Sequence, residues 1–334
     1  MMEMRIIKRT NRLKKLIIRN WLFSSRPVHN IVNILDTLSN KRCLRCIIFI
    51  IAVGSYFAIV TCRNSENEIE NAIVSLLKQT IAPKYVIVVD DGSTDSTHRI
   101  LEGLKSSNNR LYVITNPDLG YDIGRVVKNW NSAISLARKL NLENTDYHMI
   151  STDDTHYEES YSEKIMHKMD SDDKIAISSG NYDNYSYSTP HGAGRFVRNS
   201  FFEEFLHLYP EKMGYESVIL QMSLYHGFRN LVNNDARFSH TRQLGANHHF
   251  YEFGASMRTL GYHPLFVLGR FVQCFATGLP MGRIGAVQML YHYLSYKPKQ
   301  VGYDSMYAPE IRKAIRTRQK TRIMELLRLR NTNA

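Results

Sequence analysis

The chain has 334 residues, and 43% of them are hydrophobic, which is typical of a packed globular protein and excludes a disordered one. Its formal net charge of +12 is unevenly distributed. Residues 1–45 carry +9 and residues 297–334 carry +7, which leaves −4 for the middle of the chain. The basic ends, and not the mildly acidic middle, are therefore expected to meet an anionic surface.

The four cysteines are too sparse for a disulfide scaffold. Cys43 and Cys46 are spaced like half of a zinc site, but no second pair follows at ligand spacing. Free thiols in a reducing compartment are the expectation, and this predicts a cytoplasmic protein.

The first 54 residues are predicted to form a basic, partly amphipathic extension. Residues 1–23 alternate basic and apolar side chains, so a helix there would suit the surface of an anionic bilayer. A solvated extension fits the same pattern. Residues 46–62 are uncharged but slightly short of the ~20 residues that a membrane span needs. A short helix over residues 47–53 that enters one leaflet is a further alternative.

The globular part opens with a strand–helix–strand pattern. Tyr56 to Val60 and Tyr85 to Asp90 predict two strands, and Ser65 and Glu68 have the spacing of a capping box that opens a helix. The apolar residues of that helix recur at the spacing of one buried face: Ile69, Ala72, Ile73, Leu76 and Leu77. Such a unit predicts a parallel sheet.

The same alternation continues along the chain. A helix is predicted over 97–104, a strand over 111–114 and a strand over 147–150. The longer helix between these two strands has one apolar face, formed by Val126, Trp130, Ala133, Ala137 and Leu140.

Carboxylates follow two of the predicted strands. Asp90 and Asp91 end one strand before Gly92, which allows a tight turn, and Asp153 and Asp154 end another. The carboxyl edge of an open α/β sheet is where such folds bind ligands, so both pairs are expected to face a nucleotide. A diphosphate beside carboxylates needs a hard divalent cation between them, and this predicts Mg²⁺ or Mn²⁺ at Asp153 and Asp154.

Four features resemble, in order and spacing, the family 2 glycosyltransferases of the GT-A fold: Thr61-x-Arg63-Asn64, the helix ending in Gln79-Thr80, Asp90-Asp91-Gly92-Ser93-Thr94-Asp95 and Thr152-Asp153-Asp154. The resemblance covers residues 56–240 and implies a mostly parallel central sheet flanked by helices, followed here by a helical C-terminal extension. It also implies the nucleotide-sugar-binding residues Thr61, Arg63, Asp90, Asp91 and Asp153, with Asp154 on the metal. The family often has Asp-x-Asp at this point, and Ser151 stands where the first acid commonly lies.

The resemblance further implies a base. An inverting transfer needs a carboxylate that removes the proton of the acceptor hydroxyl. Matching on Gly227 puts Glu216 in that position, at the start of a helix predicted over 218–226. The alternative is that Glu216 is a first-turn charge favoured by the helix dipole.

A second metal ligand is implied by Ala236 to His240, which resembles the strand that returns a histidine to the metal in this family. Imidazole is an acceptable ligand for Mn²⁺ and a poorer one for Mg²⁺. A structural role for His240 is the alternative.

We divide the chain into an extension over 1–54, a GT-A glycosyltransferase domain over 55–245 and a helical, basic region over 246–334. The last region is rich in aromatic residues and Met. Its helices either cover the sheet or lie on a membrane, where they would bring in a lipid-linked acceptor.

The predicted function is inverting, metal-assisted transfer of one sugar from a nucleoside-diphosphate sugar to a glycan or lipid-linked glycan. The processive synthases of this family usually carry several spans and a Gln-x-x-Arg-Trp motif, and neither occurs here. A nucleotidyltransferase is one alternative, and a non-catalytic protein that binds an anionic membrane or nucleic acid is another. No nucleic-acid motif is found, so no nucleic-acid partner is expected. The predicted location is cytoplasmic, with peripheral attachment to the inner face of a membrane as an open alternative.

Overall fold

The computed structural model describes residues 54–141, 144–182, 188–242 and 250–331. All of these residues lie in one compact unit, Val53–Ala334. The predictions for the N-terminal extension, and for Cys43 and Cys46, lie outside the described residues. Cys62 and Cys274 are buried free thiols, as expected.

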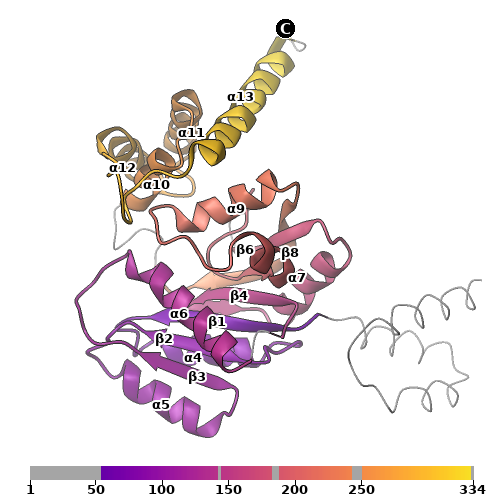
Figure 1. The fold of residues 1–334 in the computed structure, drawn as a ribbon, viewed down its shortest axis with the longest axis vertical. Helices are drawn as coiled ribbons and strands as arrows, with labels where there is room; N and C mark the ends of the chain where they lie inside the picture. Colours follow the sequence, from indigo (N-terminus) through magenta and orange to yellow (C-terminus); the bar gives the residue numbers. More distant parts are fainter. Residues whose placement is uncertain (1–53, 142–143, 183–187, 243–249, 332–334) are drawn as a thin grey trace, which may run out of the picture. The chain divides into compact units, whose positions relative to one another are not determined.

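An eight-stranded sheet forms the centre of this unit, in the order β3-β2-β1-β4-β7-β6-β8-β5 (Figure 1). The first four strands in that order run parallel to one another, whereas β7 is antiparallel to both of its neighbours. The sheet is therefore mostly parallel on the side of the predicted strand–helix–strand unit. The strands are β1 (Tyr56–Cys62), β2 (Val86–Asp90), β3 (Leu111–Thr115), β4 (Tyr147–Thr152), β5 (Thr155–Tyr157), β6 (Ile175–Tyr182), β7 (Arg195–Arg198) and β8 (Arg229–His240).

Helices cover both faces of the sheet. Side chains of α4, α5 and α7 pack on one face, and side chains of α6, α8 and α9 pack on the other. Strand β1 shows the reason, because Ala58 and Val60 join the first cluster while Phe57 and Ile59 join the second. The helices are α4 (Ile69–Leu77), α5 (Thr97–Ser107), α6 (Arg125–Lys139), α7 (Tyr161–Asp170), α8 (Asn199–Phe205) and α9 (Tyr215–Tyr225).

Two local predictions are wrong. Ser65 does not cap α4, which begins at Ile69 without a side-chain cap. The Ser65 hydroxyl donates instead to the carboxylate of Asp153, while its carbonyl oxygen accepts the amides of Glu68 and Ile69. Leu140 is exposed because α6 ends at Lys139, one residue before it.

Four helices follow the sheet: α10 (Tyr251–Thr259), α11 (Pro264–Thr277), α12 (Gly282–Ser295) and α13 (Pro309–Asn331). Helix α13 and the residue that follows α10 pack on α9 through a small cluster in which Val218 lies with Leu260, Tyr307 and Ile315. The Thr259 hydroxyl donates to the carbonyl of Met213 at 2.9 Å, just before α9 begins. The helical C-terminal extension is thus held against the start of α9.

Within the described part of the chain, no helix combines the length and the apolar character needed to cross a membrane.

Candidate active site

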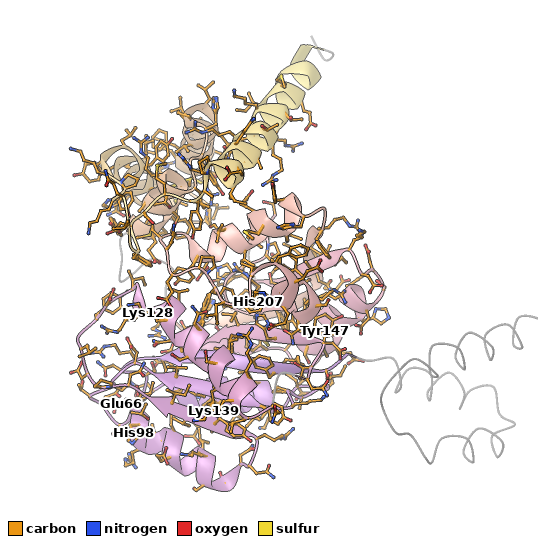
Figure 2. All side chains as sticks on the ribbon, viewed as in Figure 1. Glu66, His98, Lys128, Lys139, Tyr147 and His207 are labelled. Carbon is orange, nitrogen blue, oxygen red and sulfur yellow. The ribbon has the colours of Figure 1, made fainter. Side chains whose placement is uncertain are left out.

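Both predicted carboxylate pairs lie at one edge of the sheet. Strand β1 runs parallel to β2 on one side and to β4 on the other, with Cys62 opposite Asp90 and Thr61 opposite Thr152. The turn after β2 and the turn after β4 therefore flank the loop after β1. In Figure 2, Glu66 and His98 mark this edge.

The turn after β2 is closed by Asp90 from the inside. Asp90 is fully buried, and its Oδ1 accepts the Ser93 amide at 2.9 Å and the Ser93 hydroxyl at 2.6 Å. Gly92 has φ +71°, and a Cβ there would lie 2.6 Å from the Cα of Asp118, so only glycine fits. In this structure Asp90 shapes the turn, and a contact to a nucleotide sugar stays a prediction.

Two arginines hold the same turn. Nε of Arg125 donates to both oxygens of the Asp91 carboxylate, at 3.0 and 3.1 Å. Nη1 of Arg63 donates to the carbonyls of Asp91 and Gly92, and Nη2 donates to Asp118 at 2.7 Å. The turn is rigid because both arginines tie its backbone and its carboxylate to neighbouring loops.

Asp153 contacts the loop after β1. Its Oδ2 accepts the Ser65 hydroxyl, and its Oδ1 forms an ion pair with Arg242. Burial raises the pKa of Asp153, and the charge of Arg242 opposes this rise.

Asp154 is held as a carboxylate by three donors. Its Oδ1 accepts the Thr152 hydroxyl at 2.8 Å and Nδ1 of His240 at 3.0 Å, and its Oδ2 lies 3.4 Å from Nε of Arg242. Burial acts to raise the pKa of Asp154, but the hydrogen bond and charge of His240, followed by the charge of Arg242, outweigh it and leave that pKa well below its usual value.

The end of strand β8 and the residues after it supply both partners. It ends at His240, as the resemblance implied, and the chain then places Arg242 across Asp153 and Asp154. Nε2 of His240 is buried and has no hydrogen-bond partner among the described residues. Arg242 was not predicted, and its only signal in the sequence is its position two residues after the candidate ligand.

Glu216 lies in the first turn of α9 with a half-exposed side chain. A Cβ on Gly192 would lie 2.6 Å from its Oε2, so the carboxylate rests directly on the Gly192 backbone. Arg195 is buried beneath this contact, and its guanidinium donates to the Glu216 carbonyl at 3.0 Å and to the His191 carbonyl at 3.0 Å. The side chain is thereby fixed over the loop before β7.

That loop connects Glu216 with the carboxylates at the strand ends. His191, which precedes Gly192, has its ring 5.9 Å from the ring of His240. His240 also hydrogen-bonds Asp154. A chain of contacts therefore leads from Asp154 through the side chains of His240 and His191 and the backbone of Gly192 to Glu216. The structure thus gathers the predicted nucleotide and metal residues at one edge of the sheet, and Glu216 is linked to that edge through His191 and Gly192.

A second carboxyl, that of Glu252 in α10, is influenced by the charge of Glu216. Burial raises the pKa of Glu252 to about 8, and the charge of Glu216 adds to the rise. Glu252 is therefore protonated at neutral pH, and a half-exposed Glu216 has a neutral neighbour. Glu252 was not predicted, because it lies 36 positions after Glu216 in a different helix.

The donor atoms at Asp154 and His240 fit a divalent cation that a diphosphate would complete. Magnesium in proteins is usually bound by one or two carboxylates together with phosphates and waters. Asp154 Oδ1 and His240 Nδ1 are 3.0 Å apart and share a hydrogen bond, so an ion held by both atoms would take the place of the proton on Nδ1. Among the described residues, no group of three or more His, Cys, Asp or Glu side chains could hold a metal.

The glycosyl transferase family 2 model matches residues 57–233. This range is more than half of the chain, and the chain belongs to that family. It is therefore a glycosyltransferase with a GT-A-like fold, as the motifs predicted. No curated protein matches the chain.

Several solved structures are similar in fold. S. aureus TarS is 18% identical over 72% of this chain and 43% of its own, with a TM-score of 0.46. The mannosyltransferase PcManGT from Pyrobaculum calidifontis, solved with GDP-Man and Mn²⁺, is 14% identical over 72% of this chain and 70% of its own, with a TM-score of 0.49. GalNAc-T7, solved with UDP, GalNAc and Mn²⁺, is 12% identical over 72% of this chain and 55% of its own, with a TM-score of 0.48. At these identities the likeness concerns the fold and not the substrate.

Arg242→Ala tests the charge balance at the strand ends. Loss of the guanidinium leaves two buried carboxylates facing each other, so we expect a loss of about 1–2 kcal/mol in the free energy of unfolding without metal, less than for a fully buried pair because Arg242 is partly exposed. Mn²⁺ should restore stability to the variant more than it adds to the wild type. Urea unfolding with and without Mn²⁺ measures both effects.

Arg229→Ala is the matched control, because Arg229 pairs with Asp172 at the surface. We expect a change of less than about 1 kcal/mol and no response to Mn²⁺. Equal losses in the two variants, with no Mn²⁺ rescue of Arg242→Ala, would contradict the assigned role of Arg242.

Proposed function

We propose that the protein transfers one sugar, with inversion, from a nucleoside-diphosphate sugar to a hydroxyl of a glycan or lipid-linked glycan. The observation that carries the proposal is the convergence of Thr61, Arg63, Asp91, Asp153 and Asp154 on one sheet edge, with Glu216 reached from that edge through His191 and Gly192. Family membership supports glycosyl transfer over nucleotidyl transfer and over a non-catalytic role.

The donor side of the site is built from the loop after β1 and the turn after β2. Arg63 and Asp118 line this side with a partly exposed ion pair. Arg125 neutralises the charge of Asp91, so a nucleoside that binds here contacts a surface with little net charge. The Asp153 carboxylate beside the loop after β1 offers an acceptor to the hydroxyls of a ribose.

Asp154 and His240 would hold Mg²⁺ or Mn²⁺ together with the donor's diphosphate. Such a cation neutralises charge on the leaving diphosphate. Arg242 pairs with the same carboxylates in the absence of a donor. Since Arg242 is partly exposed, it is free to leave Asp154 and to pair with a phosphate, which a guanidinium binds in a bidentate manner.

Glu216 is the proposed base. Its carboxylate is half exposed, so an acceptor hydroxyl can reach it. The Glu216 carboxylate rests on Gly192, and Arg195 holds the start of α9 through the Glu216 carbonyl. These two contacts keep the carboxylate near the loop that contains His191. A hydroxyl that gives its proton to Glu216 becomes nucleophilic as it attacks the anomeric carbon, opposite the departing diphosphate.

Thermal unfolding with UDP or GDP plus Mn²⁺ tests the donor side. A ligand at about 100 times its Kd should stabilise the wild type by about 2.7 kcal/mol, seen as a higher melting temperature. Asp154→Ala should remove this rise because it removes a ligand of the cation. Asp173→Ala, at an almost fully exposed side chain, should keep it. A rise of the same size in Asp154→Ala would refute the metal assignment.

Glu216→Gln tests the base. The variant should keep the nucleotide-induced rise in melting temperature while the transfer rate falls about 10²- to 10⁴-fold. Glu252→Gln is the control, because Glu252 is already protonated at neutral pH and an amide mimics that state. Full activity of Glu216→Gln, or equal losses in both variants, would place the base elsewhere.

A further inference from the structure

Helices α11 and α12 carry an unusual share of the exposed apolar side chains. Nine of the seventeen exposed large hydrophobic residues in the described part of the chain fall within residues 265–294, and their exposed fractions run from 44% to 76%. We call these nine the apolar face: Leu265, Leu268, Val272, Phe275, Leu279, Ile284, Val287, Tyr291 and Leu294. Contiguous exposed apolar surface marks an interaction site.

The apolar face has helical order. On each helix its residues recur at i, i+3, i+7 and i+10, which places them on one side of that helix. The opposite side of each helix is buried where the two helices pack together. Val267 and Cys274 of α11 pack with Met289 and Tyr293 of α12 in a buried cluster. The hairpin therefore has its own core, and its outer side chains are not part of that core.

The charges around this hairpin are mostly positive. From Phe253 to Tyr303 the chain contains no Asp or Glu, and its basic residues there are Arg258, Arg270, Arg283, Lys297 and Lys299. Helix α13, which contacts α11, adds six more basic residues among the described side chains and two acidic ones. The apolar face is thus bordered by cations.

We propose that the α11–α12 hairpin is the surface by which this protein lies on a bilayer that contains anionic lipids. Apolar stripes that enter the acyl boundary, with Arg or Lys at the level of the phosphates, are how amphipathic helices bind membranes. Tyr291 on the apolar face suits the membrane–water boundary. The proposal does not depend on the donor, the cation or the base assigned above.

A second copy of the chain fits this surface less well. A two-fold interface places the same patch on both sides. Arg270 and Arg283 would then face their own copies with no carboxylate between Phe253 and Tyr303 to pair with them. An anionic headgroup supplies the missing charge, whereas a second copy does not.

Vesicle sedimentation of the full chain tests the proposal without any sugar donor. Vesicles of equal parts phosphatidylcholine and phosphatidylglycerol should bind the wild type at low salt, and vesicles of phosphatidylcholine alone should bind it more weakly. Ile284→Gln combined with Leu294→Gln should weaken binding by at least about tenfold, since two apolar side chains no longer enter the bilayer. Leu140→Gln combined with Leu208→Gln, two exposed positions outside the hairpin, should bind like the wild type.

Hydrogen exchange on the same samples locates the contact. Vesicles should protect amides within residues 264–295. Protection confined to residues 1–53, equal binding by both double variants, or equal binding to neutral vesicles would overturn the proposal. So would a dimer in solution that Ile284→Gln with Leu294→Gln dissociates, if the wild type does not bind vesicles. Unchanged melting temperatures would show that the variants are folded.

Discussion

Four carboxylates share one edge of the sheet, and the site depends on how their charge is balanced. Asp90 ends β2 and Asp91 follows it, while Asp153 and Asp154 follow β4, and β1 lies between these strands. The pKa of the Cys62 thiol, at the end of β1, shows how close these negative charges lie. Burial is the largest cause that raises this pKa well above its usual value, and the charges of nearby carboxylates add to the rise: Asp153, Asp90, Asp95 and Asp91. Three of these carboxylates have an arginine beside them: Asp91, Asp153 and Asp154.

The compensating cations come from distant parts of the chain. Arg125 neutralises Asp91, and Arg242 pairs with Asp153 and Asp154, while His240 bonds Asp154. The two halves of the site differ in one respect. Arg125 is largely buried with its partner, whereas Arg242 is partly exposed and follows the last residue of β8 closely. We infer that the ion pair of Arg125 and Asp91 stays in place when the donor binds. At Asp153 and Asp154, in contrast, a cation brought by the donor can replace the guanidinium of Arg242.

Much of the fold could be predicted because its strands and helices have clear periodicity and its acidic turns follow buried strands. The sequence also placed Glu216 at a helix start and His240 at a strand end, as the structure has them. What escaped prediction depends on tertiary contacts. Ser65 has the spacing of a helix cap but bonds Asp153, which approaches it only in the folded sheet. Arg125, Arg242 and Glu252 carry no local motif, so only the fold reveals their partners.

The most direct test of this account is a crystal structure of the protein with a nucleoside diphosphate and Mn²⁺, with the ion located by its anomalous scattering. The account predicts a manganese peak within coordination distance of Asp154 and His240, with the Arg242 guanidinium moved from Asp154 to a phosphate. A nucleotide bound at this edge with Arg242 still on both carboxylates, and no manganese beside Asp154, would contradict it.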